Sequence, residues 1–151
     1  MTTRYSALFP QGDRGGNSTH VVVPPSHASL NYHSFWDGLI LTGPKADSLV
    51  NGAPDQLADH VTEASTTADS LAANPNLART KFPQLAVADR NVWAKESIAI
   101  SLKIGYLDGD LKDGTDANNP FIMPDGFLKI AKDTAIHQAA LAGYRLADVL
   151  H

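Results

Sequence analysis

Apolar side chains recur every three or four residues through most of the chain after residue 30, and this spacing restricts the fold more than any other feature of the sequence. One turn of an α-helix takes about 3.6 residues, so side chains at this interval share one face. The pattern is longest from Pro124 to Leu150, where its apolar positions are Leu128, Ala131, Ala135, Ala139, Ala142, Leu146 and Val149. We therefore expect one long amphipathic helix there.

Three further segments carry the same spacing, namely Asn31 to Leu41, Pro54 to Ala73 and Asp89 to Tyr106. Residues 1–30 instead hold frequent glycine and proline around one β-prone run, Thr19 to Val23, which predicts a loop with at most a short hairpin before Val23. Residues 108–119 are rich in turn formers and predict a surface loop. The sequence thus predicts a single all-α domain over residues 1–151, with loop over 1–30 and helices over 31–151.

The composition excludes several kinds of site. The chain has no cysteine, which rules out disulfides, thiolate metal sites and cysteine nucleophiles. Its formal net charge of -4 provides no overall basic field for collecting nucleic acid. No apolar run approaches the roughly 18 residues that span a bilayer, and the first residues lack the basic and apolar regions of an export signal. We expect no membrane contact and no export of the chain as written.

The first candidate site is the pair His33 and Asp37. Residues four apart lie one above the other on a helix, so both side chains can reach one ion. Neutral imidazole and carboxylate are ligands that suit zinc, although a closed site takes three or four protein ligands. A histidine with an aspartate four residues later is also a common helix-surface pair, so the pair alone leaves both interpretations open.

The second candidate is the loop Gly12-Asp-Arg-Gly-Gly-Asn17. Paired glycines allow a turn with positive φ, which can direct the amide of Asn17 into a site. The loop lacks the strand and helix that frame a phosphate-binding glycine loop, so a plain turn is the alternative.

Four motifs in this order resemble one known family. They are Gly12-Asp-Arg-Gly-Gly-Asn17, Asn31-x-His33-x-x-x-Asp37, Trp93-Ala-Lys-Glu-Ser97 and Ala142-Gly-Tyr-Arg-Leu-Ala147. Together they are similar to the signature of the zinc-dependent, single-strand-specific nucleases typified by nuclease S-one and nuclease P-one, and they cover nearly the whole chain. The resemblance implies the helical domain of the phospholipase C/nuclease P-one type. It also implies hydrolysis of single-stranded DNA and RNA to 5′ nucleotides.

The resemblance assigns roles to four residues. His33 and Asp37 match the last two zinc ligands of the family, Asn17 matches an asparagine that contacts substrate near the scissile phosphate, and Gly16 shapes the same loop. In the intact family, clustered zinc ions carry the chemistry, so no protein nucleophile is expected. Family members are typically secreted or periplasmic.

The departures from the family bear on activity. Besides the two ligands that His33 and Asp37 match, members hold their three zinc ions with further ligands that precede the glycine loop, and this sequence supplies none of those. We therefore expect at most one partial zinc site, a chain that represents the C-terminal half of the domain, and little activity alone. Tyr32 stands where the family usually has leucine, a change of packing residue.

Two alternatives remain from the sequence. The chain could be a non-catalytic helical fragment from an internal start, or a hydrolase of the related zinc phospholipase C branch. The nucleotide sequence upstream of Met1 would distinguish the enzyme from the fragment. Incompletely covered apolar helix faces would also favour self-association.

Overall fold

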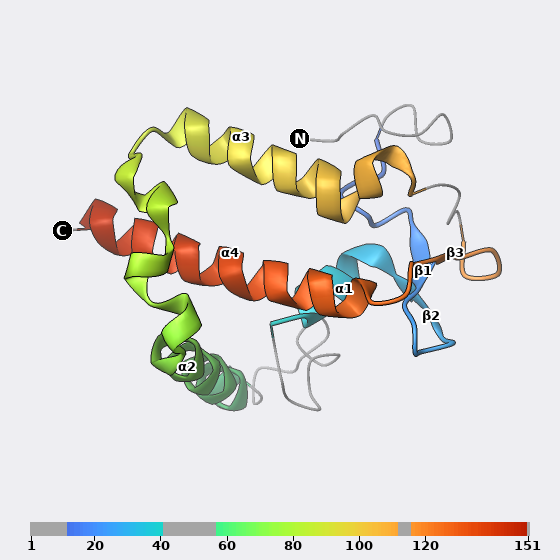
Figure 1. Cartoon of the computed structure of the whole chain (residues 1–151). Coiled ribbons are helices and arrows are strands. Elements are labelled where there is room, and N and C mark those ends of the chain that lie inside the picture. Colours follow the sequence, from blue (N-terminus) through green and yellow to red (C-terminus); the bar gives the residue numbers. More distant parts are fainter. Residues whose placement is uncertain (1–11, 41–56, 112–115, 151) are drawn as a thin grey trace. The chain divides into compact units, whose positions relative to one another are not determined.

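The computed structural model describes residues 12–40, 57–111 and 116–150, and within them helices dominate (Figure 1). The helices are α1 (Tyr32–Gly38), α2 (Leu57–Ala73), α3 (Arg90–Ile100) and α4 (Phe127–Leu150). The predicted all-α class is confirmed. Helix α1 ends at Gly38, three residues before the predicted end at Leu41. Leu41 and Pro54, the predicted first residue of α2, both lie outside the described residues.

Helix α3 begins and ends where local chemistry dictates. Asp89 is its N-cap, and the side chain accepts a hydrogen bond from the backbone N–H of Asn91 at 2.8 Å. Beyond Ile100 the helix widens into a π turn, η6 (Ser101–Gly105), and a short 3₁₀ turn follows, η7 (Leu107–Gly109). The predicted segment Asp89 to Tyr106 therefore agrees closely with the structure. Single π turns inside helices are often found near functional sites.

A small sheet of three strands lies beside α1. Strand β1 (His20–Val22) is central, pairs antiparallel with β2 (Ser29–Asn31) and pairs parallel with β3 (Phe121–Ile122). The β-prone run was correctly placed, but its hairpin partner follows Val23 instead of preceding it. Strand β3 was not predicted, because a strand of two residues is too short to show an alternating pattern.

By its internal contacts the chain divides into two compact units. Unit 1 comprises Met1–Asp37 and Asp89–Lys132. Its described buried side chains include Val21 of β1, Phe35 of α1, Leu111 after the π turn and Met123 before α4, and of these Val21, Met123 and Leu111 are each at most 2% exposed. The rings of Phe35 and Phe127 stack at 5.9 Å between centroids. These contacts fix α1 against the start of α4 within this unit.

Unit 2 comprises Gly38–Ala88 and Asp133–His151. Its described core consists of Leu77, Phe82 and Leu141. Three 3₁₀ turns that the sequence pattern did not predict connect α2 to α3, namely η3 (Pro75–Leu77), η4 (Arg79–Lys81) and η5 (Pro83–Ala86). They bring Phe82 against α4, where its ring lies 4.6 Å from that of His137 and 5.6 Å from that of Tyr144.

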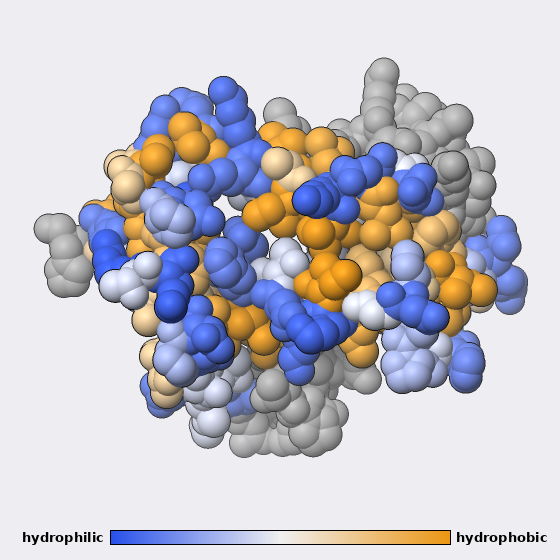
Figure 2. Space-filling view, viewed as in Figure 1, coloured by the Kyte–Doolittle hydropathy of each residue, from blue (hydrophilic) through white to orange (hydrophobic). Residues whose placement is uncertain are grey.

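The buried face of α4 differs from the predicted one. Ala131 is buried as predicted, and Phe127 and Leu141, which were not on the predicted face, are buried as well, whereas the predicted positions Leu146 and Val149 are 59% and 53% exposed. Phe127 and Leu141 bury more apolar area than the alanines that dominate the predicted stripe, so their burial contributes more to stability. Several other large apolar side chains are also exposed, and Figure 2 shows hydrophobic groups on the surface among hydrophilic ones. None of the helices in the described ranges combines the length and the apolar character needed to cross a bilayer.

Candidate metal and substrate site

The loop before β1 has a backbone that few sequences can adopt. Arg14, Gly15 and Gly16 have φ values of 59°, 70° and 91°, three consecutive residues in the left-handed region. The side chain of Asp13 is fully buried, and its Oδ1 accepts a hydrogen bond from the backbone N–H of Gly15 at 3.0 Å. An aspartate that bonds its own backbone two residues later stabilises this kind of turn. Asp13 and Arg14 are thus loop-forming residues.

Gly16 is required by space as well as by conformation. A Cβ atom at this position would lie 3.2 Å from the backbone nitrogen of His33 and 3.3 Å from Cδ1 of Tyr32. The loop therefore approaches the first turn of α1 so closely that only glycine fits without movement. This contact places the carbonyl groups of the loop beside the His33 side chain.

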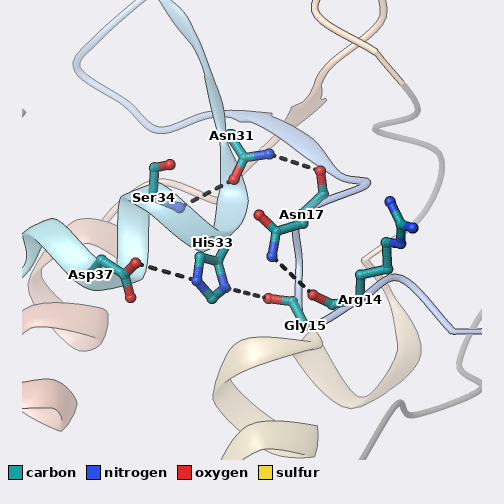
Figure 3. Close-up of polar contacts among 7 residues, drawn as sticks. All are labelled: Arg14, Gly15, Asn17, Asn31, His33, Ser34 and Asp37. Atoms are coloured by element: carbon teal, nitrogen blue, oxygen red, sulfur yellow. Dashed lines mark hydrogen bonds and ion pairs between the residues drawn. The ribbon is translucent and has the colours of Figure 1, made fainter. Parts of the chain in front are cut away.

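The two ring nitrogens of His33 have different partners (Figure 3). Nδ1 lies 3.0 Å from the carbonyl oxygen of Gly15, and Nε2 lies 3.3 Å from Oδ2 of Asp37. A carbonyl oxygen can only accept, so Nδ1 must carry a proton and donate it. In the neutral ring Nε2 then presents a lone pair towards the carboxylate. An ion-binding histidine typically has its other ring nitrogen bonded in this way.

His33 and Asp37 face solvent, with side chains 46% and 59% exposed. An ion that they held would be open to further ligands or to substrate. The expected geometry is present, since both side chains lie on one face of α1 beside the loop that carries Asn17. Their role as metal ligands stays a prediction.

Asn17 is exposed at the end of the loop. Its Nδ2 donates a hydrogen bond to the carbonyl oxygen of Arg14 at 3.0 Å, which orients the side chain. An amide nitrogen has two hydrogens, so one donor remains for an acceptor in solution. The predicted substrate contact is compatible with this arrangement but is not tested by it.

Two tyrosines hold the site from the interior of unit 1. The hydroxyl of Tyr106 donates to the carboxylate of Asp13, and the hydroxyl of Tyr32 donates to the carbonyl oxygen of Gly105 in the π turn. Sequence reasoning treated Tyr32 as a packing residue and gave Tyr106 no role beyond its helix. These contacts join residues 93 and 73 positions apart, so no local pattern could have indicated them.

The remaining motifs serve the structure. Ser97 donates from Oγ to the carbonyl oxygen of Trp93 at 3.0 Å, within α3. In the last motif Tyr144 donates from its hydroxyl to the carbonyl oxygen of Leu77 at 3.1 Å and so ties α4 to η3 within unit 2. In the described part of the chain no group of three or more histidine and carboxylate side chains is arranged to hold an ion.

Comparison with known proteins identifies the family. The sequence profile of the family described as S1/P1 Nuclease matches residues 4–151. The chain belongs to the S1/P1 nuclease family. Membership indicates a nuclease, that is, phosphodiester hydrolysis with nucleic acid as substrate, in a family that generally depends on zinc. Comparisons with curated proteins and with solved structures gave no significant match.

Proposed function

We propose that this chain carries part of the catalytic site of a zinc-dependent phosphodiesterase that cleaves single-stranded DNA and RNA to 5′ nucleotides. In this proposal His33 and Asp37 are ligands of one zinc ion, and Asn17 contacts the substrate from the loop that Gly16 shapes. The observation that carries the proposal is the spatial relationship of His33, Asp37 and the Gly15 carbonyl.

The distance between the two proposed ligand atoms fits one tetrahedral ion. Zinc binds imidazole nitrogen at about 2.0–2.1 Å and carboxylate oxygen at about 2.0–2.2 Å, which places two such ligands about 3.3–3.5 Å apart. Nε2 of His33 and Oδ2 of Asp37 are 3.3 Å apart. No rearrangement of α1 is needed to bring them to one ion.

The orientation of the imidazole supports the same proposal. Because Nδ1 donates to the Gly15 carbonyl, the neutral ring directs an acceptor at the carboxylate oxygen, and two acceptors at this distance repel each other. A cation between them removes that repulsion. A bound zinc ion supplies Lewis acidity and an activated water, so the protein itself needs no nucleophile.

The substrate contact would be local. The net charge of -4 gives no general attraction for a polyanion, so binding depends on the site and on the amide donor of Asn17. One hydrogen of its Nδ2 is held by Arg14, and the other can donate to a phosphate oxygen. A contact of this kind orients the scissile phosphate without recognising base sequence.

A second candidate is a non-catalytic helical fragment in which His33 and Asp37 form an ordinary surface ion pair. The observation in its favour is that the described residues bring no third histidine or carboxylate to this pair. A protonated imidazole satisfies the same 3.3 Å contact with no metal present. Zinc binding distinguishes the two candidates.

The test is zinc affinity, measured by competition with a chromophoric chelator. We expect one zinc per chain, and we expect His33→Ala and Asp37→Ala each to weaken binding at least tenfold, because each removes one of two ligands. The control is His27→Ala, an exposed histidine in the turn between β1 and β2. If both site variants bind zinc as the unaltered chain does, His33 and Asp37 are not ligands.

A further inference from the structure

Asn31 joins the two parts of the candidate site through the two ends of one amide (Figure 3). Its Nδ2 donates to the carbonyl oxygen of Asn17 in the loop at 2.9 Å, and its Oδ1 accepts from the backbone N–H of Ser34 in α1 at 3.2 Å. We propose that Asn31 is a positioning residue, which keeps the Gly15 carbonyl on Nδ1 of His33 and thereby leaves Nε2 as the ion-facing nitrogen. The role of the ion in this inference rests on the proposed function, whereas the orientation of His33 rests on the hydrogen bonds of Asn31 and on the contact of His33 with Gly15.

The helical end of this amide fixes where α1 begins. Asn31 is the last residue of β2 and pairs with His20 of β1, and α1 starts at the next residue. An asparagine before the first helical residue that accepts from the backbone N–H three positions later is an N-cap. The first turn of α1, and with it His33, is therefore tied directly to the sheet.

The loop end of the amide restrains the glycine loop in addition to the contacts of Asp13 and Asn17 within the loop. The contact is made at Asn17, next to three consecutive residues with positive φ, two of which are glycines. Glycine has broad conformational freedom, so a glycine pair needs external contacts to keep one arrangement. The carbonyl that His33 uses belongs to the first of these glycines, two residues before Asn17.

Only an amide side chain makes both contacts at this length. The helix end needs an acceptor and the loop end needs a donor. Aspartate and serine are good N-caps and retain the acceptor for Ser34. Aspartate has no donor for the Asn17 carbonyl, and serine has one hydroxyl too short to serve both partners. These two substitutions therefore separate the helix cap from the restraint on the loop.

Side-chain ¹⁵N spectra of the metal-free chain, recorded where imidazole is neutral, give the direct test. In the unaltered chain we expect His33 to carry its proton on Nδ1. In Asn31→Asp and Asn31→Ser we expect a mixture with the other tautomer, because the Gly15 carbonyl is no longer held in place. If His33 of the unaltered chain carries its proton on Nε2, the proposal is wrong, and this result needs no variant to fold.

The zinc affinity of the variants completes the test. Loss of a contact that orients a metal-binding histidine typically lowers affinity by 10-fold to 100-fold, and we expect at least about tenfold in both variants. Asn74→Ser is the matched control, because Asn74 caps η3 in unit 2 by accepting from the backbone N–H of Asn76. It should leave the His33 tautomer and zinc affinity unchanged.

The outcomes separate this inference from the proposed function. If the Asn31 variants keep the tautomer and the zinc affinity of the unaltered chain, Asn31 does not position His33. If the unaltered chain shows no zinc binding that depends on His33, the proposed function fails, and the tautomer of the metal-free variants still decides whether Asn31 orients the ring. If Asn31→Asp and Asn31→Ser lose as much stability as Asn31→Ala but keep the His33 tautomer of the unaltered chain, Asn31 serves only as a structural helix cap and the proposal is wrong.

Discussion

The hydroxyl of Tyr106 lies 3.2 Å from both carboxylate oxygens of Asp13, a side chain that is completely buried. Asp13 also accepts from the backbone of the glycine loop, so the carboxylate links that loop to the end of the helix formed by α3 and its π turn. A buried polar group is tolerated only while it keeps its hydrogen bonds. The conformation of the candidate site thus depends on a tyrosine far from it in sequence.

Tyr106→Phe should destabilise the chain. Removing one partner from a buried carboxylate costs about 1–3 kcal/mol, because the acceptor loses a hydrogen bond and water does not replace it. Urea unfolding of the variant measures this change. Tyr144→Phe is the matched control, since its hydroxyl donates to a neutral carbonyl in unit 2 at a partly buried position, and we expect about 0.5–1.5 kcal/mol there. A smaller loss for Tyr106→Phe than for the control would contradict the anchoring role of Asp13.

Gly16→Ala should destabilise the chain by about 1–3 kcal/mol, because the residue has a φ of 91° and its new Cβ would press on the backbone of His33. Gly143→Ala should do the opposite. Gly143 lies within α4, where an added Cβ would meet nothing within 4 Å beyond its chain neighbours and the backbone of its own helix, so alanine there should stabilise by about 0.5–1 kcal/mol through helix propensity. Thermal unfolding of the two variants checks both signs. Equal effects would show that the loop does not need its glycine.

Local patterns were sufficient to predict the helices but not the way they pack. The spacing of apolar residues correctly indicated α2, α3 and α4, because each is long enough for its period to be visible. The face of α4 was predicted only in part: Ala131 is buried as expected, but alanine counts as apolar yet contributes little area, and Phe127 and Leu141 were missed. Strand β3 depends on a partner about 100 residues away, which no local window contains.

The candidate site shows the same division. The residues that would touch an ion or substrate, His33, Asp37 and Asn17, were visible as short motifs. Asn31 and Gly16, which help to hold them, stand in the same motifs, but the long-range contacts that complete the support were not visible. Tyr32 and Tyr106 act across long separations in sequence, and the second contact of Asn31 is with a backbone carbonyl, which carries no sequence signal.

Arg79 and Asp148 form an exposed ion pair in unit 2, with Nη2 of the arginine 2.7 Å from Oδ1 of the aspartate. The hydrogen bond with Asp148 raises the pKa of Arg79 above its ordinary value. Because the pKa of Arg79 is raised in the folded state, the pair's contribution to stability is present at every pH below the pKa of Arg79 in the unfolded chain. It is lost only in strong alkali. Stability near neutral pH should therefore respond to salt through this pair, and not through titration of Arg79.

Asp148→Asn should lower the unfolding midpoint slightly at low ionic strength, and the difference should vanish near 1 M NaCl, where the screening length is about 3 Å. Asp69→Asn, an exposed position on α2, changes net charge equally and serves as the control. A midpoint difference that persists in high salt would mean that the pair acts through packing.

We also expect the chain to self-associate. The last turns of α4 expose Leu146, Val149 and Leu150, the last of these at 75%. Apolar groups gathered in this way favour association, because water is released when they are covered. Sedimentation equilibrium should show mass rising with concentration, and Leu146→Lys with Leu150→Lys should reduce the rise more than Ala147→Lys together with Ala142→Lys. A monomer at all concentrations would refute this expectation.

Finally, the 151-residue chain supplied with zinc should cleave single-stranded oligonucleotides slowly if at all. The described residues place two proposed ligands, His33 and Asp37, at the candidate site, and two protein ligands hold zinc weakly. Stabilising both the attacking and the leaving oxygen of a phosphodiester takes a pair of ions about 3.5–4 Å apart, and no second set of ligands is grouped beside the first in the described ranges. Release of 5′ nucleotides from labelled DNA and RNA, with and without zinc, measures the rate. Rapid zinc-dependent cleavage that His33→Ala abolishes would show that a single weakly ligated ion suffices.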